Sequence, residues 1–249
     1  MSTTILVLVA AAATDVGRVR RGNEDAYLVA PPVYAIADGM GGHRGGAVAA
    51  QLAIRTLASR AADLASADGE ALVAAVADAN RAIVLTADED DALRGMATTC
   101  TAALVRGRVA RIAHVGDSRA YLLHEGRLAQ LTDDHSVVAQ LVREGQLSPE
   151  DAAVHPGRSV IFRALGTQPE IEVDMLEVVL DADDRLLLCS DGLTGMLGDA
   201  EIAAILRDIA DTEMAVDALV ARANAAGGSD NVTVVLVDVR EETKRGLAP

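Results

Sequence analysis

Four aspartates stand where apolar segments of the sequence begin or end. Asp38 closes YAIAD and Asp191 closes LLLCSD, and a glycine follows each of them directly; Asp117 follows the apolar run that ends in HVG, and Asp230 precedes NVTVVLV. A carboxylate that emerges from a buried strand is poorly solvated, and several close together repel one another unless cations neutralise them. We therefore interpret the four aspartates as a candidate cation site, although a single Asp-Gly pair is more typical of an ordinary turn.

The types of oxygen donor in these motifs indicate which cation would bind. Carboxylates, backbone carbonyls and water form the all-oxygen ligand set that Mg²⁺ and Mn²⁺ prefer over Zn²⁺. We expect Gly39 and Gly192 to let the backbone turn sharply, so that a carbonyl oxygen comes within ligand distance. Cys100 and Cys189 lie in apolar segments without a neighbouring cysteine or histidine. We expect them to be buried, reduced thiols, which fits a cytoplasmic protein and not a zinc site.

The composition argues against several other classes of function. A net charge of -15 repels a nucleic-acid backbone, and an aromatic content of 2% leaves few side chains to stack on bases. With 51% hydrophobic residues in 249, the chain can bury a substantial core. The apolar segment at 3–14 is too short to span a bilayer and lacks a basic flank before it. We interpret it as an edge or core strand and expect no membrane contact from this chain.

Helix pairs and groups of strands alternate along the sequence. Apolar residues at helical spacing predict the helices, and short β-type runs separated by Arg-Gly-Arg and His-Glu-Gly-Arg are typical of an antiparallel meander. The order predicts an α+β fold in which two antiparallel sheets pack as a sandwich and pairs of helices cover both outer faces. The predicted helices cover 44–66, 69–87, 199–208 and 212–226; the meander covers 98–132, and further strands lie in 171–180, 184–191 and 231–239.

No internal repeat and no long linker interrupts this pattern, so we predict a single domain over 1–240. A polar C-terminal tail follows at 241–249, and we expect it to fray. The segment at about 143–167 contains Pro149 and Pro156 and joins a helix to a strand. We interpret it as a flap-like insert beside the site that influences substrate entry.

Eight short motifs extend the pattern from Ala11 to Val239. Together they resemble the metal-dependent protein phosphatase family, the type 2C serine/threonine phosphatases, and most closely its bacterial branch. The resemblance implies two antiparallel sheets sandwiched between helix pairs, in agreement with the order of elements above. The motifs are RVRRGNEDAY at 18–27, DGMGGH at 38–43, GMATT at 95–99, VGDSRAYLL at 115–123, LTDDHS at 131–136, ALG at 164–166, LLLCSDGL at 186–193 and SDNVTVVLV at 229–237.

The resemblance also implies which residues hold metal. Asp38 would bridge two ions, with the Gly39 carbonyl on one of them. Asp191 and Asp230 would bind the other ion. Asp117, together with Asp191, matches a third metal position found in bacterial members. The implied cofactors are two Mn²⁺ or Mg²⁺ ions, with room for a third.

Other roles concern the phosphate and the departing proton. Arg20, four residues before Glu24 as in the family pattern, would clamp the substrate phosphate, since its planar guanidinium can donate two parallel hydrogen bonds. Glu24, with Asp25 as a further candidate, would hold metal-bound water. Animal members carry a histidine, a candidate general acid, where this chain has Met40; nearby His43 is open to a structural or a chemical reading. We expect His135 to be structural, hydrogen-bonded at a helix start.

The implied activity is hydrolysis of phosphoserine and phosphothreonine in proteins by a hydroxide held between two metal ions. The expected partners are phosphorylated proteins, including the bacterial serine/threonine kinases that the enzyme opposes. We expect a cytoplasmic monomer and leave open a membrane anchor beyond residue 249. Two alternatives remain: a phosphatase of anti-sigma-factor antagonists, and a catalytically silent, phosphatase-like binding module. The presence of Asp38, Asp191 and Asp230 weighs against the silent module.

Overall fold

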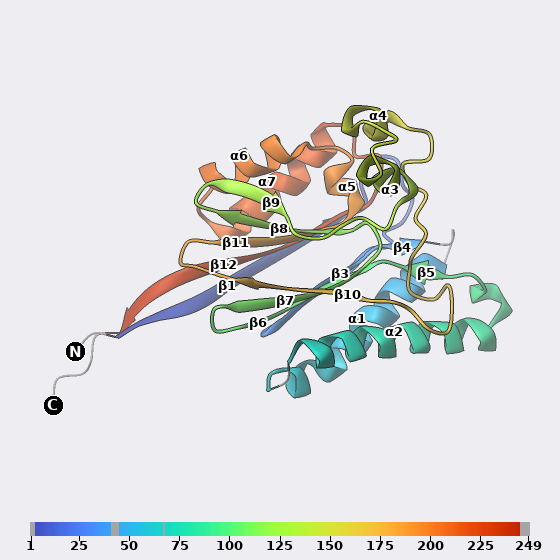
Figure 1. Ribbon diagram of the computed structural model, residues 1–249, viewed down its shortest axis with the longest axis horizontal. Helices are drawn as coiled ribbons and strands as arrows, with labels where there is room; N and C mark the ends of the chain where they lie inside the picture. The colour runs from blue at the N-terminus through green and yellow to red at the C-terminus, as the bar shows by residue number, and fades with distance from the viewer. Residues whose placement is uncertain (1–2, 41–44, 67, 245–249) are drawn as a thin grey trace.

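Two five-stranded antiparallel sheets pack face to face, and helices cover both outer faces (Figure 1). The structure is a computed structural model that describes residues 3–40, 45–66 and 68–244. The predicted α+β sandwich is confirmed. None of the helices in the described part of the chain is long and apolar enough to cross a bilayer.

The first sheet has the strand order β1-β12-β11-β8-β9, and the second has the order β10-β7-β6-β3-β2. The bounds in the first sheet are Thr3–Asp15 for β1, Val232–Lys244 for β12, Arg185–Cys189 for β11, Arg119–His124 for β8 and Arg127–Gln130 for β9. In the second sheet they are Asp174–Val179 for β10, Val109–Val115 for β7, Cys100–Arg106 for β6, Val33–Ala37 for β3 and Ala26–Ala30 for β2. A separate short pair joins β4 (Gly39–Met40) to β5 (Ala97–Thr98).

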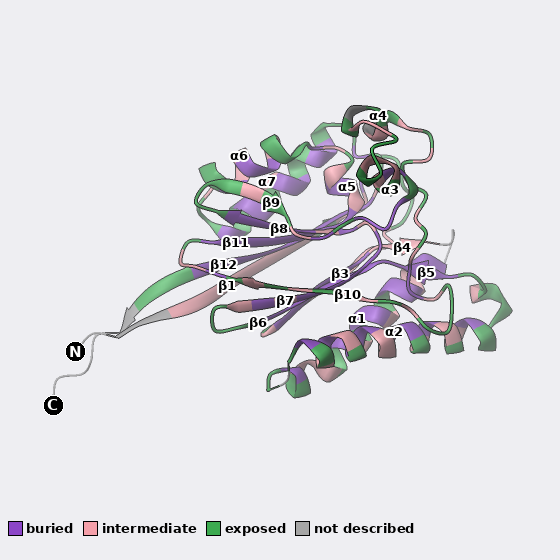
Figure 2. Cartoon of the chain, in the orientation of Figure 1, coloured by how far each residue is buried: buried purple, intermediate pink, exposed green. Residues whose placement is uncertain are grey.

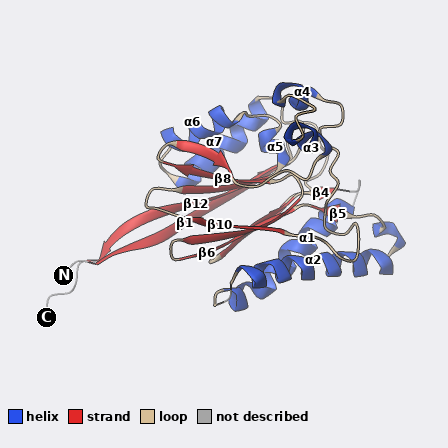
Figure 3. Cartoon of the chain, viewed as in Figure 1, coloured by secondary structure: helices blue, strands red, loops and turns tan. Residues whose placement is uncertain are grey.

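Each sheet has its own pair of long helices. α1 (Gly45–Leu64) and α2 (Gly69–Glu89) pack on the second sheet, and α6 (Asp199–Asp208) and α7 (Thr212–Ala225) pack on the first. The shorter elements are η1 (Asp91–Leu93), α3 (Val137–Arg143), α4 (Pro149–Val154) and α5 (Asp191–Thr194). Figure 3 shows α3, α4 and α5 gathered at one end of the sandwich, close to β4. This end carries the site described below.

The central strands are buried on both faces (Figure 2). In β11, Leu186 and Leu188 point into the layer between the sheets, whereas Leu187 and Cys189 point toward α6 and α7. Successive side chains of a strand face opposite sides, so a strand covered on both sides reads as an unbroken apolar run. This explains why LLLC in β11 and VYAIA in β3 show no polar alternation.

Two expectations about the strands need correction. The predicted meander is two hairpins, β6–β7 and β8–β9, in different sheets, because the chain crosses between the sheets at 116–118. Gly116 permits the crossing with a φ of +112°, a conformation that other residues rarely adopt. The tail does not fray at 241, since β12 pairs with β1 as far as Lys244. β1 is an edge strand, as predicted.

The insert follows α3 and contains α4 and an irregular stretch that returns to the second sheet. The Val137 amide donates to the Val160 carbonyl, and the Phe162 amide donates to the His135 carbonyl, so backbone hydrogen bonds join the insert to the start of α3. Leu165 then exchanges hydrogen bonds with Thr98 of β5. The insert is thereby held beside the strand ends that carry the aspartates.

Candidate metal and phosphate site

The ends of β3 and β11, the crossing between β7 and β8, and the loop before β12 meet at one end of the sandwich. They enclose a small cavity of about 150 Å³. Every site residue named from the sequence lines this cavity, although up to 210 positions separate them along the chain. These residues are Arg20, Glu24, Asp38, Gly39, Asp117, Asp191 and Asp230.

Asp38 is fixed by two motifs that lie far from it in the sequence. Its amide donates to the Thr99 hydroxyl at 2.9 Å, and the Thr98 hydroxyl donates to its carbonyl at 2.9 Å. The Thr99 hydroxyl also shares a hydrogen bond of 2.7 Å with the Ser118 hydroxyl. The sequence analysis gave no role to these three side chains. Their positions inside GMATT and VGDS were the signal, since both motifs carry hydroxyls next to strand ends.

The glycines after Asp38 and Asp191 serve close approach and not a sharp turn, which corrects our expectation. Neither Gly39 nor Gly192 has a positive φ. A β-carbon on Gly39 would lie 2.2 Å from the Gly46 carbonyl oxygen, and one on Gly192 would lie 1.9 Å from the Asn231 carbonyl oxygen. Only glycine therefore lets the α1 start and the β12 start approach the segments that carry Asp38 and Asp191 so closely.

Burial and mutual repulsion raise the pKa values of these carboxyl groups. Desolvation, followed by the charges of Asp25, Asp191 and other aspartates, raises the pKa of Asp38 well above its usual value. Desolvation and the Asp230 charge raise the pKa of Asp191. The pKa of Asp117 is raised to about 7, mainly by desolvation and then by Asp191. Such crowding of anionic oxygens favours the uptake of cations.

Asp25, which the resemblance offers beside Glu24 as a holder of metal-bound water, lies within electrostatic range of Asp38. Its Oδ2 accepts a hydrogen bond of 2.8 Å from the Ser190 hydroxyl, but its buried Oδ1 has no hydrogen-bond partner. Desolvation raises its pKa to about 7. A buried orphan oxygen among oxygen-only donors fits hard divalent cations. No three acidic, histidine or cysteine side chains in the described ranges form a complete ligand set as they stand, so the fit depends on this donor chemistry.

Arg20 reaches the cavity from the loop before β2. Its Nη2 donates to Asp230 Oδ2 at 2.7 Å, and 54% of its side chain is exposed. Asn231 holds this loop in place: its amide nitrogen donates to two carbonyls of the 16–22 loop, and its Oδ1 accepts from the Glu24 amide at 2.8 Å. The sequence analysis missed Asn231, although its place beside Asp230 in SDNVTV marked it.

The histidine and cysteine expectations can be checked in the same region. His135 is structural, as expected: its Nδ1 accepts from the Gly116 amide at 3.0 Å, and its Nε2 lies 3.1 Å from Asp174 Oδ2, just before α3 begins. Cys100 and Cys189 are buried free thiols, and burial raises the pKa of each to about 12. His43 lies outside the described residues.

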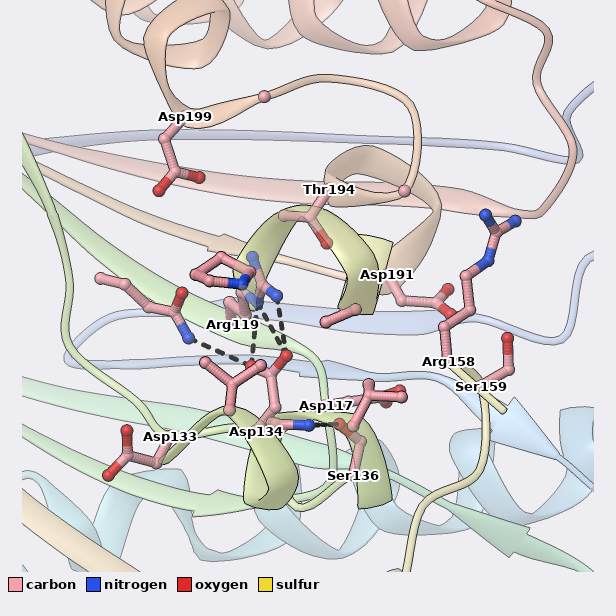
Figure 4. Close-up of a pocket in the computed structure, with 18 of the residues that line it drawn as sticks. Asp117, Arg119, Asp133, Asp134, Ser136, Arg158, Ser159, Asp191, Thr194 and Asp199 are labelled. Carbon is pink, nitrogen blue, oxygen red and sulfur yellow. Dashed lines mark hydrogen bonds and ion pairs between the residues drawn. The ribbon is translucent and has the colours of Figure 1, made fainter. Parts of the chain in front are cut away.

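A second, larger cavity of about 890 Å³ adjoins the first (Figure 4). It lies between α3 and α4 on one side and the α5–α6 connection on the other, and it shares Asp117, Asp191 and Ser159 with the small cavity. Arg119 forms part of its lining and makes a bidentate ion pair with Asp134, with distances of 2.8 to 3.1 Å. The small cavity lined by the aspartates is thus continuous with the larger cavity.

Comparisons with known proteins agree with one another. A family model described as protein phosphatase 2C matches residues 22–226. A serine/threonine phosphatase, stp, of Listeria monocytogenes is 42% identical over 243 residues, which covers 94% of this chain and 96% of the relative. The serine/threonine protein phosphatase PstP of Mycobacterium tuberculosis is 44% identical over 240 residues. The match covers 96% of this chain and 46% of that longer relative.

Solved structures show the same likeness in three dimensions. The Mycobacterium tuberculosis serine/threonine phosphatase PstP/Ppp superposes with a TM-score of 0.89 at 43% identity, covering 94% of this chain and 99% of that one. The catalytic domain of PstP in complex with two manganese ions superposes with a TM-score of 0.88 at 42% identity, with the same coverage.

Proposed function

The chain belongs to the protein phosphatase 2C family and is a metal-dependent serine/threonine protein phosphatase, and we propose that the carboxylates around Asp38 hold its metal ions. The observation that carries this assignment is the meeting of all seven predicted site residues around one cavity. The relative that carries two manganese ions supports Mn²⁺ or Mg²⁺ as the cofactor.

The ligand roles proposed here are those that the family resemblance implies, and the position of all these residues at one cavity supports them. We propose that Asp38 would hold both ions and that the Gly39 carbonyl would join it for one of them. Asp191 and Asp230 would hold the other, and Asp117 with Asp191 would offer a third position. When bound, two such cations lower the pKa of water and offset the charge of the phosphoryl oxygens.

Glu24 and Asp25 complete the surroundings of the ions. We propose that Glu24, held by Asn231, hydrogen-bonds metal-bound water. Asp25 accepts from the Ser190 hydroxyl through Oδ2, and we propose that its buried, unpartnered Oδ1 accepts a hydrogen bond from water at the site. The proposed role of these two residues is to orient water, whereas the bound ions would offset the charge of the phosphoryl oxygens.

Arg20 is the proposed phosphate clamp. Its guanidinium is half exposed at the mouth of the cavity and donates to Asp230, so a phosphate at the site can accept from its other N–H groups. Arg20→Lys removes the planar fork, and we expect KM for a phosphothreonine peptide to rise about tenfold. Arg21→Lys, at the exposed neighbouring position, is the matched control. Equal kinetics for the two variants would contradict the assignment of Arg20.

The insert at 143–167 is the proposed flap. Two of its residues, Ser159 and Ile161, line the small cavity, so its position affects the space that a substrate enters. Replacing 145–157 by a short Gly-Ser linker should change kcat/KM for a phosphoprotein more than for p-nitrophenyl phosphate, which is too small to contact α4. An equal change for both substrates would rule out a selective role for the flap.

Phosphorylated proteins are the substrates, and we propose that they include bacterial serine/threonine kinases, whose action this enzyme reverses. We also propose that it acts as a cytoplasmic monomer and that residues 1–240 form one phosphatase domain. The alternative substrates are anti-sigma-factor antagonists. The presence of the insert with α4 favours kinases, since the branch acting on antagonists lacks much of this insert. Phosphate release from a phosphorylated kinase fragment and from a phosphorylated antagonist, assayed side by side, distinguishes the two. Faster turnover of the antagonist would overturn the kinase assignment.

A further inference from the structure

The large cavity beside the metal site has no role in the mechanism above. Its apolar wall comes from α3 and α4, with Val138, Val142 and Pro149, and its opposite wall comes from Thr194 and Leu197 at the α5–α6 connection. At about 890 Å³ it lies within the size range of pockets that hold a drug-sized ligand. Figure 4 shows charged side chains projecting into it from both walls.

The position of this cavity identifies its occupant. Asp117, Asp191 and Ser159 line both cavities, so the two are continuous. A phosphorylated side chain seated at the metal site belongs to a peptide whose next residues must leave across a neighbouring surface. The large cavity opens directly from the shared wall, and we therefore take the substrate chain beside the phosphorylated residue as its occupant.

The carboxylates that line the cavity differ in whether another residue forms an ion pair with them. Five of them line it: Asp117, Asp133, Asp134, Asp191 and Asp199. Asp117 and Asp191 belong to the metal site, and Asp134 is paired with Arg119. Asp133 and Asp199 are exposed, and the described residues provide neither with an ion pair. Asp199 accepts a hydrogen bond of 3.0 Å from the Tyr121 hydroxyl, which orients it without neutralising it.

Positive and negative groups are placed at different ends of the cavity. Arg158 lies within electrostatic range of Asp191, at the end next to the metal site. Arg143 donates to the Asp134 carbonyl on the α3 side. Asp133 and Asp199 lie on the side of the view away from Arg158 and Ser159 in Figure 4. The cavity is thus suited to a chain segment with a phosphate at one end and a positive charge at the other.

We propose that the cavity between the flap and the α5–α6 connection is a specificity subsite for the substrate chain, in which Asp133 and Asp199 select a lysine or arginine side chain near the phosphorylated residue. This inference rests on the proposed function and names a class of preferred substrate: phosphothreonine or phosphoserine segments with a basic residue a few positions away.

A lysine scan of a phosphothreonine peptide tests the subsite. Peptides with a neutral alanine and glycine background carry one lysine, alanine or glutamate at each position on both sides of the phosphothreonine, and phosphate release is measured with Mn²⁺. For the wild type we expect one or two positions at which lysine raises kcat/KM about fivefold over alanine through KM, the scale of a partly screened ion pair. Glutamate at the same positions should lower kcat/KM.

For each variant, kcat/KM for the lysine peptide is divided by kcat/KM for the alanine peptide measured with the same protein. In Asp133→Asn/Asp199→Asn, the ratio of lysine to alanine should fall to about one. The matched control is Asp208→Asn/Asp217→Asn, which changes the net charge equally at exposed positions outside the cavity and should keep the wild-type ratio. Asp133→Lys/Asp199→Lys should reverse the preference toward glutamate. Circular dichroism of each variant reports that it is folded.

Two different results would overturn the proposal. Rapid turnover with equal kcat/KM for lysine and alanine at every position, or a lysine preference that survives in Asp133→Asn/Asp199→Asn, would overturn the subsite alone. Absence of Mn²⁺-dependent phosphate release from the alanine peptide by folded wild-type protein would overturn the proposed function and the subsite with it.

Discussion

Gly192 lies against the start of β12, where a β-carbon would be 1.9 Å from the Asn231 carbonyl oxygen. The same asparagine holds the loop that carries Arg20 and Glu24 through its side chain. A displacement of Asn231 would therefore shift Asp191, Asp230 and Arg20, the proposed phosphate clamp, together. At the scale of single residues, the site depends on backbone segments that touch without any side chain between them.

Gly192→Ala tests this contact. We expect the free energy of unfolding to fall by about 3 kcal/mol, the upper end of overpacking costs, because the obstacle is rigid backbone. Phosphate release should be lost as well. Gly22→Ala, where nothing lies within 4 Å of the added carbon, should change stability by less than about 0.5 kcal/mol. Urea unfolding of both variants makes the comparison, and equal losses would show that the close approach is not the cause.

His114 makes stability depend on pH. Its Nε2 lies 3.1 Å from the Asp133 carbonyl and its Nδ1 lies 2.9 Å from the Thr101 hydroxyl, so the neutral ring satisfies both partners. Burial, with a smaller effect of His135, lowers its pKa from 6.5 to about 4. Below pH 6.5 the unfolded chain binds a proton that the folded chain excludes until about pH 4. Stability is therefore fully present above pH 6.5 and falls as the pH decreases.

From about pH 7 to about pH 5, this linkage should cost the wild type about 2 kcal/mol. Urea unfolding at the two pH values measures the loss. In His114→Gln, which cannot take up the proton, the loss should be smaller by that amount, whatever the variant's stability at neutral pH. An unchanged pH dependence in the variant would mean that other groups are responsible.

The residues of the site could be predicted from the sequence to an uneven degree. Asp38 and Asp191 were visible because an apolar run ends on each of them, and motif order placed Arg20 and Glu24. Thr99 and Asn231 stood inside the motifs but received no role, because their importance lies in contacts with segments far away in the chain. The sequence also could not show that one oxygen of Asp25 has no hydrogen-bond partner. Residue type also misled at Gly39, where the space for a neighbouring backbone and not the turn itself requires glycine.

At the scale of elements, a buried ion pair joins the first sheet to its helices. Arg185 of β11 and Asp238 of β12 are 6% and 4% exposed, and Arg185 Nε donates to Asp238 Oδ1 at 2.7 Å. Asp238 also accepts from the Thr212 hydroxyl at the start of α7, and Arg185 donates to the Ile209 carbonyl that ends α6. The connection between α6 and α7 is thus attached to the two central strands.

Asp238→Ala should lower the free energy of unfolding by about 3–5 kcal/mol, because it leaves the Arg185 charge buried and unpaired. Asp238→Ala/Arg185→Met should recover part of that loss, since the uncompensated charge is gone. Glu201→Ala breaks the more exposed pair with Arg222 and should cost about 1 kcal/mol or less. Chemical denaturation of the three variants measures these free energies of unfolding. A double variant that is less stable than Asp238→Ala would contradict this account.

Local patterns predicted the elements better than their partners. The helix predicted at 199–208 matches α6, and the turn residues of both hairpins were located correctly, with Glu125 and Gly126 at positive φ between β8 and β9. The crossing at 116–118 was missed, because a strand's own sequence does not state which sheet it joins. The pairing of 241–244 was missed because its polar residues lie on a strand that projects beyond the helices (Figure 1).

At the scale of the whole molecule, the site joins the two sheets. Asp38 follows β3 of the second sheet, Asp191 and Asp230 flank β11 and β12 of the first, and Asp117 lies in the crossing between them. Cations bound there would connect both layers and reduce repulsion in a chain whose net charge is -15. Metal binding should therefore stabilise the folded protein as a whole.

Mn²⁺ at about a hundred times its dissociation constant should add about 2.7 kcal/mol to stability for each site filled. For a chain of this size that corresponds to a rise of about 5–10 °C in Tm, measured by calorimetry. Asp38→Ala should show little or no rise, whereas Asp208→Asn, outside the site, should match the wild type. The same rise in Asp38→Ala would place the stabilising ions elsewhere.

The most direct test is phosphate release from a phosphothreonine peptide by the wild type, Asp38→Ala and Asp191→Ala, each with EDTA, Mg²⁺ and Mn²⁺. We predict turnover by the wild type with either metal, none with EDTA, and a loss of about a thousandfold or more in both variants, because each removes a ligand of the ions that stabilise the transition state. Metal-dependent turnover that persists in both folded variants would contradict the assignment of these carboxylates as the catalytic metal ligands.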